Sequence, residues 1–461
     1  GNLTYGGYGG AVMWTGSIGD IYNSTFVNNE AHYNSVAISG GRGGAIYLQG
    51  STAGNCSNTT FDKCTFENNI AGTNGGAIDW HEGAHDGLVN NSVFINNKAN
   101  ANGGAVYWRG HHGDIYNSNF TNNTALGLLK GTYNNTGDGG AVFWAGINGT
   151  VMNCRFIDNE AIKNNDSHIT GRGGAIYLGQ CNNGNNTTKI IDSYFANNTA
   201  GTNGGAIDWH EGAHNGMVDN CTFINNTAKR SAGAIFWNGH NGTIQYSKFY
   251  ENNALGIANA SSVHGERTGE ITYGGDGGAV MWSGSEGYII YSNFVNNTAA
   301  KRGGAIFLQG SDSEKKCEDT VFEHSYFANN RAGSNGGAID WNNEAINGLV
   351  NNVTFLNNTA GRSGGAIFWN GENGTVRNSK FTNNRATGTF TLDQTVDLGY
   401  EFNLVYENVV KINGATLPST LEANKLYVLN YTNSSIGSEF LKFESYVCDK
   451  DGKPVKLGET I

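Results

Sequence analysis

One pair of short motifs recurs twelve times along this chain of 461 residues. The first motif reads Gly-Ala-[Ile/Val]-x-[Trp/Leu], and a second glycine precedes it in every copy except the eighth, which has Ala232 there. The second motif reads small-x-Phe-x-x-Asn and follows the first in every unit. Self-similar units of 26 to 45 residues are typical of solenoids, in which each repeat packs only on its neighbours. The sequence therefore predicts a stack of twelve similar units.

The units are numbered here from 1 to 12, and a longer period lies above them. The alanines of the first motif are Ala11, Ala45, Ala77, Ala105, Ala141, Ala175, Ala206, Ala234, Ala279, Ala305, Ala338 and Ala366. The phenylalanines of the second are Phe26, Phe66, Phe94, Phe120, Phe156, Phe195, Phe223, Phe249, Phe294, Phe327, Phe355 and Phe381. Residues 72–99 recur closely as 201–228 and more loosely as 333–360. Residues 1–386 therefore form three four-unit blocks, at about 1–130, 131–262 and 263–386.

Residue parity predicts which side chains of the first motif face inward. The Ile/Val and Trp/Leu positions lie two residues apart and share one face of a strand. The residue between them is aromatic or methionine in nine units, and it is Asp79, Asp208 or Asp340 in the third unit of each block. Because a repeated aspartate is costly to bury, the Ile/Val and Trp/Leu positions are predicted to form the core.

The second motif predicts a bend and, with it, the fold class. An aliphatic residue or Phe stands five positions before each motif Phe, and a small residue stands two before it. These offsets have opposite parity, so both residues face inward only if the chain turns at an Asn-rich corner between them. Such coils, stacked at roughly 4.8 Å, build an all-β, right-handed parallel β-helix of about twelve coils, the hand following from crossover statistics. The absence of proline from the first 417 residues agrees, because proline would delete ladder hydrogen bonds.

Composition excludes several classes of protein. The net charge is -11, and only 15% of residues are charged, which argues against a nucleic-acid partner. No apolar run reaches the ~18 residues of a membrane span, so no transmembrane segment is predicted in this chain. Because residue 1 is a glycine inside a motif, we expect a piece of a longer secreted protein whose signal peptide and anchor lie elsewhere.

Residues 387–461 change character. Alternating apolar and polar residues there predict a small C-terminal antiparallel β domain. Residues 448–461 resemble the opening turn and strand of an immunoglobulin-like module. The last stretch stops too early to close a sandwich. We therefore expect this domain to be incomplete or to exchange strands with another copy of the chain.

The motif pair resembles a known repeat family. Gly75-Gly76-Ala77-Ile78 and the run from Phe94 to Asn97 are similar to the GGA[ILV] and FxxN signature of the polymorphic outer-membrane protein (Pmp-type) repeat family. The adhesin-like surface proteins of methanogenic archaea carry similar repeats. The resemblance spans about 386 of the 461 residues, and it implies a secreted, surface-attached protein with adhesive function.

Two sets of side chains are candidates for a site. The motif His81-Glu82-Gly83-Ala84-His85, repeated at 210–214, matches H-E-x-x-H, but it follows a strand and contains glycine, whereas zinc proteases place this motif on a helix. A loop is the favoured interpretation. The alternative is a structural metal site made by the histidines that adjacent coils bring together, namely His81, His85, His111 and His112, with His210, His214 and His240 in the second block.

The second set is the outward aromatic row of the first motif. Its candidate ligand-binding members are Tyr47, Tyr107, Phe143, Tyr177, Phe236, Phe307 and Phe368, and Met13 and Met281 complete it. One interpretation is a sheet face covered by loops or by a neighbouring molecule. The other is a flat platform that binds a glycan or a protein, since exposed apolar patches commonly mark contact sites. Length variation between coils, longest from Leu255 to Gly277, places the variable loops along one edge of the column.

Cysteines and sequons complete the candidate residues. Cys64, Cys154 and Cys221 replace inward serines and are expected to be buried free thiols, while Cys56 and Cys64 are the one close pair in sequence. Asn-x-[Ser/Thr] sequons recur at the corner of the second motif, so surface glycosylation competes with a structural role there. The candidates are Asn122, Asn197, Asn225, Asn296 and Asn357.

The resulting prediction is an extracellular cell-surface adhesin-like protein or stalk, without catalytic residues or cofactors. Its expected partner is a glycan or protein on another cell, or copies of itself through the C-terminal strands. One alternative is a self-assembling subunit of an extracellular filament or sheath. A second is a polysaccharide-degrading β-helix enzyme, which would need clustered carboxylates. Asp79, Asp208 and Asp340 instead recur four coils apart, roughly 19 Å at the usual strand spacing.

Overall fold

A computed structural model describes most of the chain, in two units. The described residues are 7–34, 39–49, 56–81, 83–127, 137–163, 170–179, 187–210, 213–256, 274–310, 317–342, 345–388, 409–413, 416–422, 426–433, 440–448, 451 and 453–460. The first unit is Gly1–Thr387 and the second is Gly388–Ile461. None of these described residues forms a helix that could cross a bilayer.

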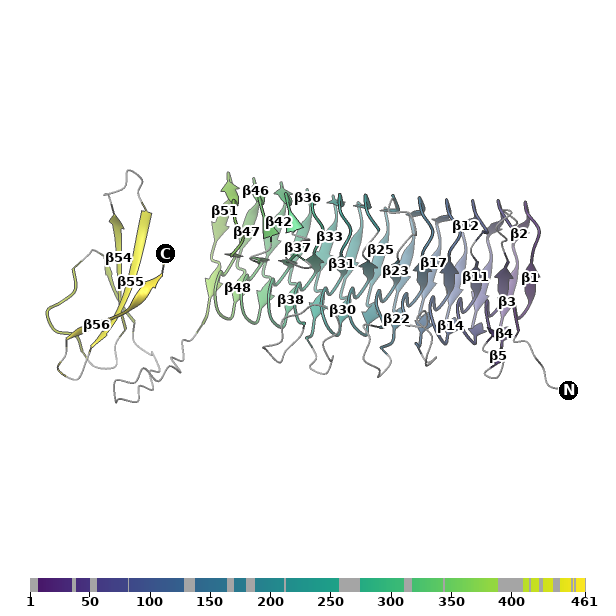
Figure 1. Ribbon diagram of the computed structural model, residues 1–461, viewed down its shortest axis with the longest axis horizontal. Coiled ribbons are helices and arrows are strands. Elements are labelled where there is room, and N and C mark those ends of the chain that lie inside the picture. The colour runs from purple at the N-terminus through teal and green to yellow at the C-terminus, as the bar shows by residue number, and fades with distance from the viewer. Residues whose placement is uncertain are drawn as a thin grey trace. The chain divides into compact units, whose positions relative to one another are not determined.

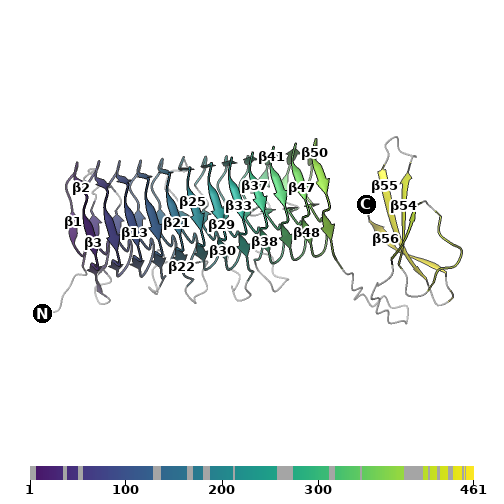
Figure 2. The ribbon, with the colours of Figure 1, turned by 180° about the vertical axis from the view of Figure 1, so that it is seen from behind.

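The first unit is a right-handed parallel β-helix, as predicted (Figure 1). Each of its twelve coils contributes one strand to each of four twelve-stranded parallel sheets. The four sheets run the whole length of the column, which Figure 2 shows from behind. Every strand therefore pairs with its counterparts in the coils before and after it, and with no strand of its own coil.

The four sheets are named by their inward residues. The GGA sheet contains β1 (Val12–Trp14), β7 (Ile46–Leu48), β11 (Ile78–Trp80), β15 (Val106–Trp108), β19 (Val142–Trp144), β23 (Ile176–Leu178), β27 (Ile207–Trp209), β31 (Ile235–Trp237), β35 (Val280–Trp282), β39 (Ile306–Leu308), β44 (Ile339–Trp341) and β49 (Ile367–Trp369). The aliphatic sheet contains β2 (Asp20–Tyr22), β8 (Thr60–Asp62), β12 (Leu88–Asn90), β16 (Asp114–Tyr116), β20 (Thr150–Met152), β24 (Lys189–Ile191), β28 (Met217–Asp219), β32 (Thr243–Gln245), β36 (Tyr288–Ile290), β41 (Val321–Glu323), β46 (Leu349–Asn351) and β50 (Thr375–Arg377).

Two further sheets close each coil. The Phe sheet contains β3 (Thr25–Val27), β9 (Thr65–Glu67), β13 (Val93–Ile95), β17 (Asn119–Thr121), β21 (Arg155–Ile157), β25 (Tyr194–Ala196), β29 (Thr222–Ile224), β33 (Lys248–Tyr250), β37 (Asn293–Val295), β42 (Tyr326–Ala328), β47 (Thr354–Leu356) and β51 (Lys380–Thr382). The Ala sheet contains β4 (Glu30–Ala31), β10 (Ile70–Ala71), β14 (Lys98–Ala99), β18 (Thr124–Ala125), β22 (Glu160–Ala161), β26 (Thr199–Ala200), β30 (Thr227–Ala228), β34 (Asn253–Ala254), β38 (Thr298–Ala299), β43 (Arg331–Ala332), β48 (Thr359–Ala360) and β52 (Arg385–Ala386).

Two short pairs lie outside these sheets. Strands β5 (Tyr33–Asn34) and β6 (Ser39–Gly40) pair antiparallel in the segment that connects β4 of the first coil to β7 of the second. Strands β40 (Cys317–Glu318) and β45 (Ala345–Ile346) pair parallel between coils 10 and 11.

The predicted core positions are confirmed. The motif Ile/Val and Trp/Leu side chains of coils 2 to 11 are fully buried, and so are the motif phenylalanines. Strands pair in register, so each inward ring meets the equivalent ring of the next coil; Phe94 and Phe120, for example, stack with centroids 4.6 Å apart. Offset stacking at this distance stabilises aromatic pairs beyond the area they bury. The core is thus a set of columns, each made of equivalent residues from successive coils.

A buried asparagine ladder closes the corner after each phenylalanine. The Asn123 side chain illustrates it, because its amide fills four hydrogen bonds. Its Oδ1 accepts from the backbone N–H and the Nδ2 of Asn97, at 3.0 Å each. Its Nδ2 donates to the carbonyl of Phe94 at 3.1 Å and to Oδ1 of Asn159 at 3.0 Å. A fully satisfied polar network of this kind fixes the register of a core.

Two corners of each coil, one of them the corner of the asparagine ladder, bring the chain into the left-handed region. The residue between the aliphatic and Phe sheets has a positive φ in all twelve coils, as Asn117 shows at 49°. The residue between the Phe and Ala sheets does so too, as Asn122 shows at 55°. Asparagine is favoured there because its short side chain tolerates this conformation and bonds locally. These corners confirm the bend predicted from parity.

Within each coil, the size of the Trp or Leu side chain on the GGA sheet is matched by the size of a residue just before the aliphatic strand. Wherever the first motif carries Trp, glycine stands two residues before the inward aliphatic residue, because a β-carbon there would overlap the indole. Gly113 beside Trp108 is one of nine such pairs. In the three coils with Leu48, Leu178 and Leu308, a buried threonine takes this place; the threonines are Thr59, Thr188 and Thr320. This Trp–Gly and Leu–Thr pairing is visible in the sequence but was not predicted.

The second unit contains one four-stranded sheet in its described part. Its strands are β53 (Val409–Asn413), β54 (Leu426–Asn433), β55 (Phe440–Cys448) and β56 (Pro454–Thr460). Strands β54, β55 and β56 pair antiparallel, but β53 runs parallel to β54. The expectation of an antiparallel domain is therefore confirmed for β54, β55 and β56 and wrong for β53. The immunoglobulin-like type and strand exchange remain predictions, and residues 389–408 lie outside the described part.

Replacing Asn123 by Asp should destabilise the column locally. The carboxylate cannot donate to the Phe94 carbonyl or to Oδ1 of Asn159, so two buried hydrogen bonds are lost, at about 3 kcal/mol in total. Oδ1 of Asn159 keeps the backbone N–H of Asn123 as a donor. Hydrogen exchange at coils 3 to 5 and the urea midpoint measure the effect. Asn122→Asp is the matched control, since Asn122 is exposed and should change stability by less than about 0.5 kcal/mol. Equal effects of the two variants would contradict the role of the ladder.

A double-mutant cycle tests the Trp–Gly and Leu–Thr pairing. Gly113→Thr alone should destabilise through overlap with Trp108, and Trp108→Leu alone through a cavity, by about 2–4 kcal/mol each. The double variant recreates the pair found in coils 2, 6 and 10. The free energy of unfolding that the double variant loses, measured in urea, should be smaller than the sum of the two single losses by more than about 1 kcal/mol. Additive losses would show that the two positions are not coupled.

Candidate ligand-binding surface

The outward row of the GGA sheet lies where parity placed it, but much of it is not exposed. Tyr47, Tyr107, Tyr177 and Phe307 are at most 5% exposed. Phe143, Phe236 and Phe368 are partly buried. The prediction of an open aromatic platform was therefore wrong for Tyr47, Tyr107, Tyr177 and Phe307. Their rings pack into an outer layer instead, as the stacks of Phe143 on Tyr107 (4.8 Å) and on Tyr177 (5.0 Å) show.

The three aspartates of this row are also buried. Asp79 and Asp208 are fully inaccessible and Asp340 is 2% exposed. Residue parity correctly predicted that the aspartates face away from the core. The assumption that an outward aspartate reaches solvent was wrong. The physical reason is that arginines and aromatic rings cover the outside of the sheet and form a second packed layer.

One arginine per block organises this layer, and the sequence analysis missed it. Arg42, Arg172 and Arg302 each stand directly before the Gly-Gly-Ala of the Leu-containing coil. The Arg172 guanidinium lies 4.5 Å from the centroid of the Tyr177 ring, and that of Arg302 lies 4.2 Å from the Phe307 ring. Cation–π contacts are strongest when desolvated in this way. The three arginines recur every four coils, as the aspartates do, and this shared period could have indicated that they pack together.

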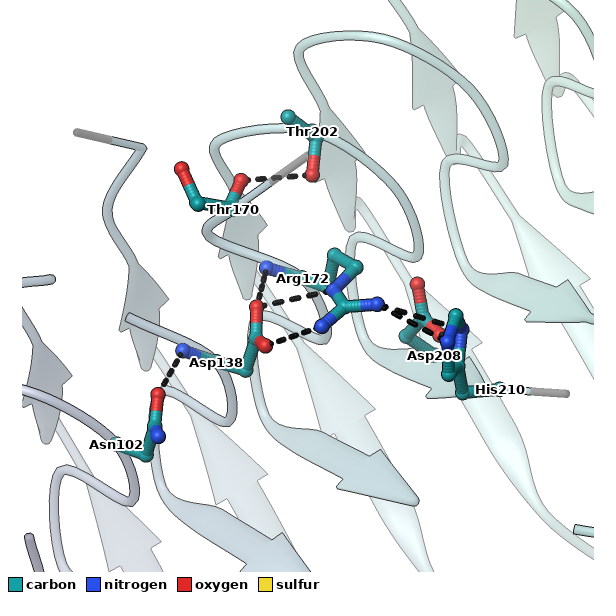
Figure 3. A network of polar contacts seen from close by, with 7 residues as sticks. All are labelled: Asn102, Asp138, Thr170, Arg172, Thr202, Asp208 and His210. Atoms are coloured by element: carbon teal, nitrogen blue, oxygen red, sulfur yellow. Dashed lines mark hydrogen bonds and ion pairs between the residues drawn. The ribbon is translucent and has the colours of Figure 1, made fainter. Parts of the chain in front are cut away.

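In the second block Arg172 is held by a carboxylate of the preceding coil (Figure 3). Its Nη2 donates to Oδ2 of Asp138 at 2.6 Å, and its Nε donates to Oδ1 at 3.2 Å. The Arg172 backbone N–H also donates to Oδ1, at 2.9 Å. Nη1 turns the other way and lies 3.3 Å from both ring nitrogens of His210. The charge of Arg172 is thus matched mainly by Asp138.

Asp208 lies on the other side of Arg172 without a hydrogen bond of its own. Neither carboxylate oxygen has a hydrogen-bond partner among the described residues, and the nearest His210 nitrogen is 3.8 Å away. Burial raises the pKa of Asp208 to about 8; Arg172 opposes this increase and Asp138 adds to it. Burial therefore favours the protonated, neutral form of Asp208.

Differences between the blocks explain the different pKa values of the other two aspartates, Asp340 and Asp79. The third block repeats the second, since Arg302 binds Asp276 at 2.8 and 3.0 Å, and burial raises the pKa of Asp340 to about 7. The first block has Tyr8 at the position of Asp138. There Arg42 turns to Asp79 instead, with Nε 3.1 Å from Oδ2. Burial raises the pKa of Asp79 only to about 6, because Arg42 and Arg109 oppose it.

The H-E-x-x-H histidines act as corner acceptors in the described part of the chain. Nδ1 of His85 accepts the backbone N–H of His111 at 3.0 Å, and Nδ1 of His111 accepts that of Ile147 at 3.2 Å. The second block repeats this with His214 and His240. His81 lies apart, against the Tyr47 ring, and His112 lies 3.4 Å from Asp86. Among the described residues, no three possible ligands gather, so a metal site finds no support here.

The predicted thiols and corner asparagines are placed as follows. Cys64, Cys154 and Cys221 are buried free thiols, as predicted, and Cys56 is also free. Each sequon asparagine is exposed at a positive-φ corner: Asn122, Asn197, Asn225, Asn296 and Asn357. The following asparagine is buried in the ladder in every case. Glycosylation stays a prediction, and most residues of the longest variable loops, 128–136, 164–169 and 257–273, lie outside the described part.

Exposed aromatic side chains gather on a different face. Away from the first and last coils, the large apolar residues that the structure describes as exposed are Ile70, Tyr246, Leu255, Tyr288 and Tyr291. Three of these five are tyrosines of coils 8 and 9, on or next to the aliphatic sheet. This face, and not the outward row of the GGA sheet, presents aromatic surface to solvent. The sequence analysis missed it because the residues break the corner pattern instead of following a row.

Asp208→Asn should change how the stability of the column depends on pH. The folded pKa of Asp208 is raised above the ordinary value of about 3.9, so the unfolded chain loses its proton first. The free energy of unfolding therefore falls as pH rises from about 4 to about 8, and then levels. The substituted amide does not titrate in this range, so the variant should gain urea resistance at pH 8 and differ little at pH 5.

Asp138→Asn is the matched control for this titration. It removes the carboxylate that binds Arg172, so it should destabilise at both pH values. Urea midpoints at pH 5 and pH 8 compare the three proteins. If the Asp208 variant showed the same midpoint shift at both values, Asp208 would not be the titrating group.

Comparison with known proteins agrees with the repeat pattern. The model of the Chlamydia polymorphic membrane protein repeat matches six segments, at residues 63–79, 91–107, 192–208, 291–309, 324–340 and 352–368. Each segment runs from a Phe motif to the following Gly-Gly-Ala strand. No curated protein matches the chain.

Solved structures show only distant likeness. A tailspike protein of E. coli bacteriophage HK620, in complex with a pentasaccharide, is 10% identical over 98% of this chain and 81% of that chain, with a TM-score of 0.44. PfbA, a surface adhesin of Streptococcus pneumoniae, is 12% identical over 91% and 92%, with a TM-score of 0.37. The A-module of Azotobacter vinelandii mannuronan C-5 epimerase AlgE6 is 12% identical over 76% and 91%, with a TM-score of 0.34. Likeness at this level says nothing of function, whereas the family model identifies repeats of the Chlamydia polymorphic membrane protein type in six places of this chain.

Proposed function

We propose that the chain is an extracellular, cell-surface adhesin-like protein or stalk that attaches to a glycan or protein of another cell. The observation that carries this proposal is the contrast between interior and surface. Inside, every coil repeats the same ladders, so the interior offers length and rigidity alone. Outside, corner and strand residues differ from coil to coil. Repeats of the polymorphic membrane protein type fit such a surface protein, and repetition provides multivalency.

The proposed protein is not an enzyme. Glycan-cleaving sites need two carboxylates that reach one sugar bond. Asp79, Asp208 and Asp340 are buried and recur once per block, so no two of them can share a substrate. The Asp138–Arg172–Asp208 cluster does bring two carboxylates around one arginine, but both carboxylates are fully inaccessible.

An oxidising exterior is compatible with the cysteines. Burial raises the pKa of Cys154, Cys221 and Cys317 to about 12, so these thiols stay protonated at neutral pH. Thiols in this form are poor nucleophiles and poor partners for oxidation. They behave as small apolar core residues.

One observation favours the alternative of a self-assembling subunit. Coil 12 leaves Val376 and Phe381 of its ladders 45% and 49% exposed, beside an apolar hollow of about 540 Å³ that Ile367 and Trp369 also line. A second copy stacked there would continue the columns. Light scattering over a concentration series separates the two proposals, because a filament subunit should grow in mass with concentration.

Bead attachment tests the proposed function. Beads coated with the full chain should adhere to some members of a panel of cell types and to surfaces coated with their glycans. Beads coated with the urea-denatured chain are the control for non-specific sticking. Equal attachment of both bead types to every cell would refute adhesion. Release of reducing ends from polysaccharides incubated with the chain would refute the non-enzymatic assignment.

A further inference from the structure

Three successive coils break the rule for the corner between the aliphatic and Phe sheets. This corner has φ between 45° and 54° in every coil. It is Asn or Asp in eight coils: Asn23, Asn91, Asn117, Asn153, Asp192, Asn220, Asn352 and Asn378. Lys63 stands alone in coil 2. Coils 8, 9 and 10 carry Tyr246, Tyr291 and His324 at φ of 50°, 50° and 49°.

Large rings at this corner are strained and are not needed for packing. The left-handed conformation crowds the β-carbon against the backbone, and Tyr lacks the short polar side chain that compensates Asn. Tyr246 and Tyr291 are 52% and 46% exposed, so little core contact offsets this strain. Residues held in such conformations cluster at functional sites.

The three rings form one ordered stack along the column. The centroids of Tyr246 and Tyr291 are 5.1 Å apart, and those of Tyr291 and His324 are 4.8 Å apart, with interplanar angles of 9° and 3°. Stacked rings point their edges and polar ends at solvent. Nδ1 of His324 lies 2.7 Å from Nδ2 of Asn352, which leaves Nε2 as the ring nitrogen for another partner. The stack thus presents hydroxyl, hydroxyl and imidazole groups at the coil spacing.

Tyr246 is the last ring of the stack on the side of coil 7. The neighbour of Tyr246 on the side of coil 7 is Asn220, which has no ring. Nδ2 of Asn220 donates to Oδ1 of Asp192 at 2.7 Å, toward coil 6. The side chain of Asn220 is thereby directed away from Tyr246, whose ring is the more exposed of the two stacked tyrosines.

We propose that Tyr246, Tyr291 and His324, with the adjoining Tyr288, bind a neutral oligosaccharide. The apolar face of one sugar ring packs on the face of Tyr246 that no other ring of the stack covers, as sugars and aromatic rings commonly pack. Sugar hydroxyls along the glycan then bond the tyrosine hydroxyls and Nε2 of His324. Tyr288, 49% exposed in β36, widens the contact on the neighbouring strand.

The surroundings favour a neutral glycan over other partners. The charges beside the stack are of mixed sign, since Lys248 is exposed while Glu323 and Asp219, the register partner of Gln245, are partly buried, so the patch has no cationic cluster that would select an acidic partner. It is one corner residue wide over three coils, whereas a stable protein interface takes about 20–30 residues a side. A linear glycan matches both the width and the periodic hydroxyl groups. This inference rests on the proposed function, for which it names the class of partner.

The test compares the full chain with a triple variant on a panel of immobilised neutral and acidic oligosaccharides. In the variant Tyr246→Asn, Tyr291→Asn and His324→Asn restore the residue that the corner prefers. We expect the wild type to bind neutral oligosaccharides and the triple variant to lose at least tenfold in affinity. Its urea midpoint should be equal or higher, since the strain is removed, and this separates a binding role from a structural one.

Two further variants sharpen the result. Lys63→Asn makes the same kind of change at the same corner of coil 2, away from the stack, and should leave binding unchanged. Tyr246→Phe keeps the ring face and should retain most of the affinity that Tyr246→Asn loses. Absence of binding at millimolar neutral oligosaccharide, or equal binding by the triple variant, would overturn the proposal.

Two other outcomes would also be decisive. A wild type that pairs in light scattering, and a triple variant that does not, would make this face a contact between copies and overturn the glycan site. If coated beads still adhere while the panel stays negative, the inference fails and the proposed function stands. If the panel is positive and beads adhere to no cell, the proposed function fails and the glycan site stands.

Discussion

Register between coils is the constraint on which the rest of this structure depends. Each inward residue lies against its own counterpart in the next coil, so a slip of one residue would turn every core side chain outward. The buried asparagine ladder enforces that register, because the amide of Asn123 finds its partners only in Asn97, Asn159 and the Phe94 carbonyl. Stacked phenylalanines fill the same role with dispersion forces.

Within that register the chain can vary only in compensated ways. Replacing Trp by Leu at the GGA strand removes volume, and the change from Gly to Thr two residues before the aliphatic strand returns part of it. The exchange occurs in the second coil of every block. The outer layer follows the same block period, with Arg172 hydrogen-bonded to Asp138 and packed beside the unpartnered carboxyl of Asp208. The fold therefore repeats at two lengths, one coil for the core and four coils for the charged outer layer.

The core and the class of fold were predictable from the sequence because they depend on parity and period alone. Trp108, Phe120 and Asn123 each recur at a fixed place, and burial follows from recurrence. The burial of Asp208 was not predictable, because it depends on how Arg172 and Tyr177 pack on the outside of the sheet. Tyr246 and Tyr291 escaped notice because they depart from a pattern, and such departures have meaning only once the backbone shows that their corner is left-handed.

The asparagine ladder also gives the column a direction. Every described rung points the same way, from Nδ2 of one coil to Oδ1 of the next, beginning at Asn29 and ending at Asn384. Hydrogen bonds in such a chain polarise one another in one sense. The first coil consequently presents an amide oxygen and the last coil an amide N–H, so the two faces of any coil are chemically unlike. Coils can therefore be duplicated or lost only head to tail. An insertion of four coils would keep both this polarity and the four-coil period of the charged outer layer.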